Sequence, residues 1–129
     1  MVNAMCPKPI VLLVVDDQPA DRELLSRVFR KGGYEVLTAG SGLEALALLR
    51  ERRDIALVVT DLLMPEGNGW VLTTEIRRLH RQLPVVLTSG ATGVESPRAY
   101  LHADGCFLKS DPPGKMLEIV AECLPDRRP

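Results

Sequence analysis

The stretch Val58-Val59-Thr60-Asp61-Leu62-Leu63-Met64-Pro65-Glu66-Gly67-Asn68-Gly69 carries the most information about the fold of this chain. An apolar run typical of a buried strand ends on a single carboxylate, Asp61, and a turn rich in proline and glycine follows. An earlier apolar run, Ile10-Val11-Leu12-Leu13-Val14-Val15, ends in the same way on the acidic pair Asp16-Asp17. If both runs are parallel strands of one sheet, they end at the same edge, and three carboxylates lie side by side.

Carboxylates placed so close together call for a cation, because like charges raise one another's pKa unless they are neutralised. Ligands that offer only oxygen suit a hard cation, and Mg2+ binds through one or two carboxylates together with phosphate oxygens and water. The acidic cluster therefore predicts a site in which a carboxylate accepts a phosphoryl group in the presence of Mg2+.

The composition is that of one globular domain. The 129 residues, 46% of them hydrophobic, predict a single domain over residues 1–129 with a core at about residues 10–124. The net charge of −1 gives no indication of the basic surface that binds nucleic acid. The three cysteines are too few and too scattered for a disulfide framework or a zinc site. No apolar run approaches the ~18 residues that span a membrane, and the first nine residues lack the features of a signal peptide. We expect a cytoplasmic protein that binds neither nucleic acid nor membrane.

Apolar runs alternate with segments of helical period, which is the pattern of βα units and a parallel sheet. The predicted strands are residues 10–15, 35–38, 55–60, 85–88 and 106–108. The first, third and fourth are almost continuously apolar, as expected for strands covered on both faces. The second is mixed in character and fits the edge of the sheet.

Capping residues predict five helices between and after these strands. Pro19 opens the first at its N1 position and Gly32-Gly33 end it, while Ser41 and Glu44 form a capping box for the second, which runs to about Arg50. The remaining three are predicted to begin at Asn68, with Leu72, Ile76 and Leu79 on one face of that helix, at Ser96-Pro97, and at Asp111-Pro112.

The ends of four predicted strands carry side chains that suit phosphoryl transfer. Asp61 can attack phosphorus, and the acidic pair before it in the chain can hold Mg2+. Lys109 is a point charge that can reach a phosphate oxygen, and either Ser89 or Thr88 can donate a hydrogen bond to the same group. Each feature is weak alone, and together they indicate one site.

At these residues the chain resembles the receiver domain of two-component response regulators, over about residues 10–124. The resemblance implies a flavodoxin-like, doubly wound (βα)5 fold, α/β in class, whose five-stranded parallel sheet has the order 2-1-3-4-5. It also implies that Asp61 takes its phosphoryl group from a sensor histidine kinase or a phosphotransfer protein. The segments that carry the resemblance are Val14-Val15-Asp16-Asp17, Asp61-Leu62-Leu63-Met64-Pro65 with Gly69, Pro84-Val85-Val86-Leu87-Thr88-Ser89-Gly90, and Ala103-Asp104-Gly105-Cys106-Phe107-Leu108-Lys109.

The resemblance further implies roles for individual residues. Mg2+ would be held by Asp17, Asp61 and the backbone carbonyl of Leu63, with Asp16 acting mainly through metal-bound water. Counting five residues on from Pro84 makes Ser89 the switch hydroxyl and directs Thr88 away from the site. Phosphorylation would then change the conformation and engage a downstream protein or a second copy of the chain.

Two departures from the family pattern affect the response to phosphorylation. Lys109 is followed by Ser110, where the family usually has proline, so the loop after the lysine is expected to take another path. The position of the aromatic residue that usually moves with the switch hydroxyl holds Cys106. A cysteine cannot act as a large rotameric signal, so we expect the coupling at Cys106 to differ while the chemistry at Asp61 is kept.

Two other functions compete with this interpretation. An aspartate-nucleophile phosphatase resembles the site but needs a second aspartate two residues after the nucleophile, and position 63 is leucine. A binding scaffold could keep the fold without phosphorylation, although the complete acidic set and Lys109 argue against it. We therefore expect a signalling module and not an enzyme.

Overall fold

The computed structural model describes residues 8–64, 69–80, 82–90 and 103–125. Their elements are β1 (Val11–Val15), α2 (Pro19–Lys31), β2 (Glu35–Ala39), α3 (Gly42–Glu51), β3 (Ile55–Asp61), α4 (Gly69–Leu79), β4 (Val85–Ser89), β5 (Gly105–Leu108) and α5 (Pro113–Cys123). All five predicted strands are confirmed, each to within one residue at either end. The helices predicted to begin at Asn68 and at Ser96-Pro97 have those start points outside the described residues.

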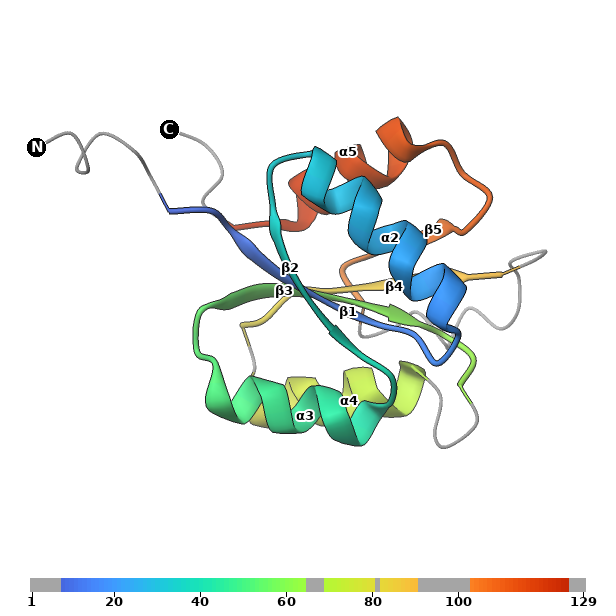
Figure 1. Cartoon of the computed structure of the whole chain (residues 1–129). Helices are drawn as coiled ribbons and strands as arrows, with labels where there is room; N and C mark the ends of the chain where they lie inside the picture. The colour runs from blue at the N-terminus through green and yellow to red at the C-terminus, as the bar shows by residue number, and fades with distance from the viewer. Residues whose placement is uncertain (1–7, 65–68, 81, 91–102, 126–129) are drawn as a thin grey trace, which may run out of the picture.

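The strands form one parallel sheet in the order β2-β1-β3-β4-β5, which confirms the predicted topology. Helices α2 and α5 cover one face of the sheet, and α3 and α4 cover the other (Figure 1). Strands β1 and β4 are buried along their whole length, and β3 along nearly all of it, because helices lie on both sides. Strand β2 lies at the edge, as its mixed sequence predicted, and contains both buried and exposed residues.

Two hydrophobic clusters fill the space between the sheet and its helices. Successive side chains of β1 point to opposite faces, so Leu12 and Val14 join the cluster beneath α2 and α5, whereas Leu13 and Val15 join the cluster beneath α3 and α4. Phe29 and Ile76 are completely buried, one in each cluster. This double core fixes the strands and, with them, the positions of the residues at the strand ends.

The predicted helix starts hold in part. Pro19 stands at N1 of α2, and Gly33, with φ of 100°, follows its C-terminus in a conformation that glycine adopts readily. The Ser41 hydroxyl caps α3 by accepting a hydrogen bond from the Glu44 N–H at 3.2 Å. The Glu44 carboxylate accepts from the Gly40 N–H at 2.8 Å, one residue earlier than in the usual capping box.

One prediction about helix residues is wrong. Asp111 does not begin α5, because the helix starts at Pro113, and its carboxylate instead accepts a hydrogen bond from the Leu108 N–H at 2.9 Å. Leu79 has helical spacing with Leu72 and Ile76 but is 48% exposed. It is the last residue of α4 and lines an open pocket at the end of the sheet, so no core side chain covers it.

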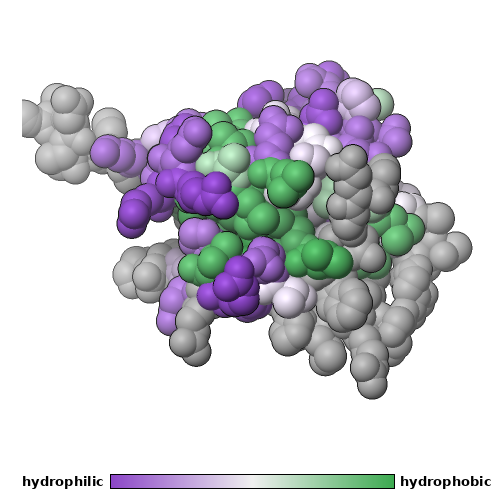
Figure 2. Space-filling model, turned by 90° about the horizontal axis from the view of Figure 1, so that it is seen from below, coloured by the Kyte–Doolittle hydropathy of each residue, from purple (hydrophilic) through white to green (hydrophobic). Residues whose placement is uncertain are grey.

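Hydrophobic side chains are also exposed on the face of the molecule that α3 and α4 form (Figure 2). Leu43 of α3 is 78% exposed and Val71 of α4 is 54% exposed. Hydrophilic side chains flank this apolar surface (Figure 2). Within the described part of the chain, no helix is both long enough and apolar enough to cross a membrane.

Candidate functional site

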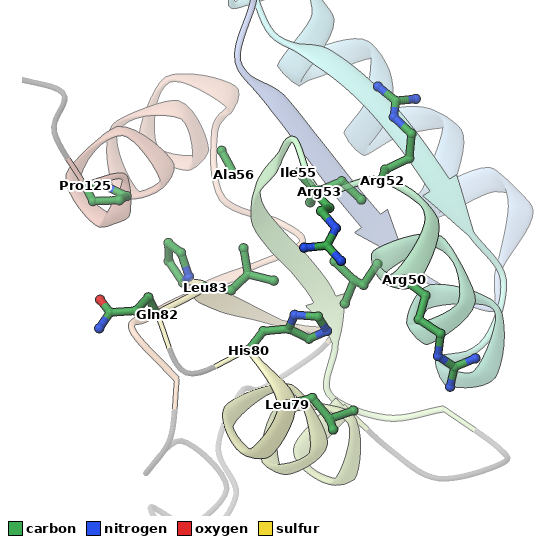
Figure 3. A pocket seen from close by; sticks show the side chains of 12 residues that line it. Arg50, Arg52, Arg53, Ile55, Ala56, Leu79, His80, Gln82, Leu83 and Pro125 are labelled. Atoms are coloured by element: carbon green, nitrogen blue, oxygen red, sulfur yellow. The ribbon is translucent and has the colours of Figure 1, made fainter.

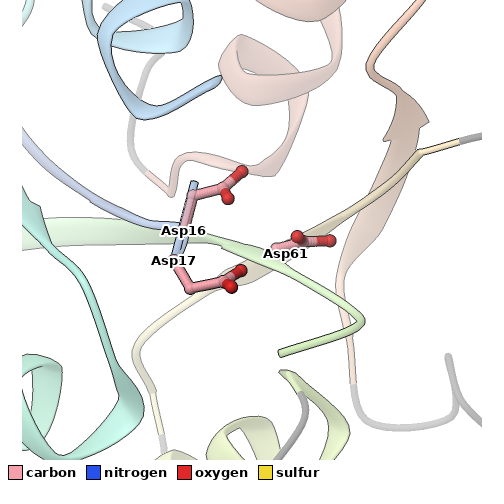
Figure 4. Close-up of side chains that lie close together, drawn as sticks. All are labelled: Asp16, Asp17 and Asp61. Carbon is pink, nitrogen blue, oxygen red and sulfur yellow. The ribbon is translucent and has the colours of Figure 1, made fainter. Parts of the chain in front are cut away.

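The sheet brings the three predicted carboxylates together at its carboxyl edge. Asp16 and Asp17 follow β1, Asp61 ends β3, and one oxygen of each lies within 4.8 Å of the others (Figure 4). Asp16 is completely buried, Asp61 is 7% exposed and Asp17 is half-buried. The parallel pairing of β1 with β3 produces this cluster from residues more than forty positions apart, because both strands end at the same edge.

The turn after β1 uses only one oxygen of Asp16. The Asp16 Oδ1 atom accepts a hydrogen bond from the Gln18 N–H at 2.9 Å, which closes the turn into α2. Its Oδ2 atom is buried and forms an ion pair with Lys109, but no described residue donates a well-directed hydrogen bond to it. A buried carboxylate oxygen in this condition, beside two further carboxylates, suits a hard divalent cation with oxygen ligands. The residues present therefore fit Mg2+.

Asp61 is held by the close approach of β3 to the start of α4. The Leu63 N–H donates to Asp61 Oδ1 at 3.3 Å, and the Gly69 N–H donates to the Leu62 carbonyl at 2.7 Å. A Cβ atom at Gly69 would lie 2.2 Å from the Asp61 backbone oxygen, so this contact requires glycine. Leu63 itself is 65% exposed beside the site.

Lys109 reaches into the same cluster from the end of β5. Its Nζ atom lies 2.8 Å from Asp16 Oδ2, 2.9 Å from Asp21 Oδ2 and 3.1 Å from Asp61 Oδ2. The Lys109 N–H donates to the Ser89 carbonyl at 2.9 Å, and Asp111 closes the next turn through its bonds with Leu108. The segment after Lys109 is thus held without the proline that the family usually has there.

These contacts shift two pKa values. Burial raises the pKa of Asp61 above the ordinary value for aspartate; Lys109 opposes this rise, and the charge of Asp16 adds to it. Burial alone would lower the pKa of Lys109, but the carboxylates of Asp16, Asp21 and Asp61 outweigh burial and raise it. The lysine therefore stays protonated, and ionisation of Asp61 is less favourable than that of an ordinary aspartate.

The predicted switch residues lie at the ends of β4 and β5. Thr88 is in register with Asp61, is completely buried, and has a hydroxyl without a hydrogen-bond partner among the described residues. Ser89 follows it, is 6% exposed and pairs with Leu108, the residue before Lys109. The choice between the two hydroxyls stays a prediction.

The coupling position on β5 has its own arrangement. Cys106 is exposed, whereas the neighbouring Phe107 is buried and packs edge-on against Phe29, with ring centroids 6.4 Å apart. The aromatic residue of β5 is therefore a core residue, and the exposed position beside it carries only a thiol. Whether Cys106 takes part in coupling stays a prediction.

Asp21 is the residue of the site that the sequence analysis missed. It lies in the first turn of α2 and reaches Lys109 across 88 positions of sequence. Its place one helical turn after the acidic pair was the available signal. A helix that starts directly behind a strand end carries its first-turn side chains close to that edge.

A pocket of about 730 Å3 lies at the opposite end of the sheet, where β3 and β4 begin (Figure 3). Its rim includes Arg50, Arg52, Arg53 and His80. Arg52 is paired with Asp54 at 2.8 Å, and the side chains of Arg50 and Arg52 point away from the centre of the group (Figure 3). None of the predicted site residues lines this pocket.

Comparison with known proteins shows which family the chain is similar to. The model of the response regulator receiver domain family matches residues 12–121. The chain is 36% identical over 98 residues to the "Probable transcriptional regulatory protein TcrX" of Mycobacterium tuberculosis strain H37Rv, covering 76% of this chain and 42% of that protein. It is 38% identical over 102 residues to the sensor histidine kinase RcsC of Salmonella typhimurium strain LT2, covering 78% of this chain and 11% of that protein. The chain thus spans less than half the length of these relatives.

Solved structures show the same fold. The response regulator TrrA of Thermotoga maritima, in complex with Mg(2+)-BeF, superposes with a TM-score of 0.82 at 32% identity, covering 88% of this chain and 98% of that one. A response regulator receiver protein from Pseudomonas putida gives a TM-score of 0.81 at 32% identity, covering 91% of this chain and 99% of that one.

Proposed function

Because the chain belongs to the response regulator receiver domain family of two-component systems, we propose that Asp61 accepts a phosphoryl group from the phosphohistidine of a sensor histidine kinase or a phosphotransfer protein. A carboxylate oxygen of Asp61 forms a bond to phosphorus as the bond from phosphorus to the histidine nitrogen breaks, which leaves an acyl phosphate on the protein. The imidazole departs as neutral histidine because its other ring nitrogen carries a proton. The reaction is a transfer, and this chain is the acceptor.

One observation supports this role above all others: Asp61 Oδ2 lies 3.1 Å from Lys109 Nζ, and the Asp61 carboxylate clusters with those of Asp16 and Asp17. The carboxylate thus lies beside one cation and belongs to a cluster suited to a second cation. Two positive groups at one carboxylate are what a negatively charged phosphoryl group needs when it approaches.

Mg2+ fits the donor set of the site. Asp17, Asp61 and the backbone carbonyl of Leu63 would hold it directly, with Asp16 acting through metal-bound water. When bound, the ion supplies positive charge that offsets the charge on the transferring group. Asp16 and Lys109 are in contact before transfer, so the lysine is already at the edge of the site.

After transfer, the Ser89 hydroxyl, or that of Thr88, donates a hydrogen bond to the phosphoryl group, and Lys109 binds another phosphoryl oxygen. This local change biases the segment after β4, which lies outside the described residues. The surface that includes β5, with Cys106, and α5 then receives a downstream protein or a second copy of the chain. The names of two relatives support a role in two-component signalling, because TcrX is named as a regulatory protein and RcsC as a sensor histidine kinase.

Titration with beryllium fluoride, a phosphoryl mimic, tests this function. In saturating MgCl2 the wild-type protein should bind the mimic, as measured by calorimetry, and Asp61→Asn should not. Glu23→Gln is a matched control, since it also removes one negative charge, but from a 63%-exposed side chain that pairs with Arg27. A binding scaffold without phosphorylation would show no binding in any of the three proteins, or equal binding in all of them.

A further inference from the structure

Lys109 is shared among more carboxylates than the transfer reaction requires. Its ammonium group has three N–H donors, and three carboxylate oxygens lie within 3.1 Å of it, one each from Asp16, Asp21 and Asp61. Asp16 and Asp61 have roles in the proposed transfer. Asp21 comes from a different element, the first turn of α2, and has no part in that scheme.

The contact of Asp21 is not explained by helix capping alone. An acidic residue in the first turn interacts favourably with the helix N-terminus. The hydrogen bond that Asp21 accepts, however, comes from Lys109 Nζ, at 2.9 Å. The carboxylate is therefore directed toward the site, across the gap between α2 and the end of β5.

Asp21 also adds a negative charge to a site that already has an excess. Three carboxylates, those of Asp16, Asp21 and Asp61, lie at one ammonium group, and the carboxylate of Asp17 lies beside those of Asp16 and Asp61. The Arg22 guanidinium lies nearby but donates to the Asp16 backbone carbonyl at 2.8 Å and not to a carboxylate. Nearby negative charge favours the binding of a cation and disfavours the binding of an anion.

A phosphoryl oxygen that binds Lys109 competes with the carboxylates already at the ammonium group, of which Asp21 and Asp61 accept its hydrogen bonds. Asp16 is completely buried, and Asp61 carries the phosphoryl group. Asp21 has a side chain that is 39% exposed, so water can solvate its carboxylate most readily of the three when Lys109 no longer binds it. Its bond to Lys109 is the one that the phosphoryl group would break.

We propose that Asp21 is a positioning residue that holds Lys109 before phosphorylation and competes with the phosphoryl group for it. The proposal rests on the function proposed above and deepens it. With Asp21 at this position, the site has a lower affinity for a phosphoryl group and a higher affinity for Mg2+ than it would have with a neutral residue. Asp21 thereby favours the unphosphorylated state of the domain over the phosphorylated state.

The test measures two affinities in Asp21→Asn, which keeps the size of the side chain and removes its charge. The affinity for Mg2+ alone should fall, and the affinity for beryllium fluoride in saturating MgCl2 should rise, each by roughly threefold to tenfold for a charge in the second layer around the site. The opposite signs matter, because simple structural damage would lower both affinities. Glu23→Gln, on the same helix, should change neither.

The outcomes separate this proposal from the function on which it rests. If Asp21→Asn lowers the affinity for beryllium fluoride, or matches Glu23→Gln in both measurements, the competing role of Asp21 is wrong. Asp61→Asn reports on the function itself. If that variant binds the mimic as tightly as the wild-type protein, the proposed function fails, whatever Asp21→Asn shows.

Discussion

At the scale of single residues, Asp61 is subject to opposing influences. Burial and the nearby charge of Asp16 raise its pKa, and Lys109 lowers it without restoring the ordinary value. The ionised carboxylate is therefore less favourable in the folded protein than in the unfolded chain. An aspartate with a raised pKa decreases the free energy of unfolding at every pH at which it is ionised. Residues that serve function rather than stability often destabilise the fold in this way.

This condition predicts that Asp61→Asn is more stable than the wild-type protein at neutral pH without Mg2+. A raised pKa in the folded state destabilises the protein above that pKa, and the effect disappears below the ordinary value of about 3.9. Thermal unfolding in EDTA across pH should therefore show a difference in favour of the variant at pH 7 that shrinks as the pH falls. A variant less stable than the wild-type protein at neutral pH would contradict the shift assigned to Asp61.

At the scale of elements, the contact between β3 and α4 depends on one glycine. A Cβ at Gly69 would lie 2.2 Å from the Asp61 carbonyl oxygen and 3.0 Å from its carbonyl carbon. Both atoms belong to the backbone, which cannot move aside as a flexible side chain can. The end of β3, and with it the Asp61 carboxylate, is thus fixed by the absence of a side chain on the first residue of α4.

We expect Gly69→Ala to lower the free energy of unfolding by about 1–3 kcal/mol or more, because overpacking at a fixed backbone contact is destabilising. Gly114→Ala is the control, since a Cβ at this position of α5 meets nothing within 4 Å. That change should be neutral or stabilise by up to ~1 kcal/mol, because alanine favours the helix. Chemical denaturation measures both. Equal stability of the two variants would show that the close contact at Gly69 is not present in solution.

At the helix ends, some features could be predicted from the sequence and others could not. Ser41 and Pro19 were identified from local rules and hold, because a cap involves only neighbouring residues. Leu79 followed the same helical spacing as Leu72 and Ile76, yet it is exposed, because burial depends on what lies beyond the last turn of α4. Asp111 was predicted to start a helix, but its carboxylate instead accepts a hydrogen bond from the Leu108 N–H.

At the scale of the whole molecule, the parallel sheet is what assembles the site. The apolar runs were enough to predict the strands, the family resemblance supplied their order, and parallel strands necessarily end at one edge, so the meeting of Asp16, Asp17, Asp61 and Lys109 could be predicted. The participation of Asp21 could not, because the direction of its side chain depends on how α2 packs over the sheet. The hydroxyl that acts as the switch is likewise not decided by the order of strands, since Thr88 and Ser89 are adjacent and both buried.

Covalent labelling is the most direct test of the claim that Asp61 is the phosphoryl acceptor. The wild-type protein, Asp61→Asn and Glu23→Gln are incubated with a small phosphodonor such as acetyl phosphate and MgCl2, and intact masses are measured before the modified peptide is mapped. We expect the mass of one added phosphoryl group on the wild-type protein and on Glu23→Gln, located at Asp61, and none when EDTA replaces MgCl2. Equal labelling of Asp61→Asn, or a label mapped to another residue, would contradict this assignment.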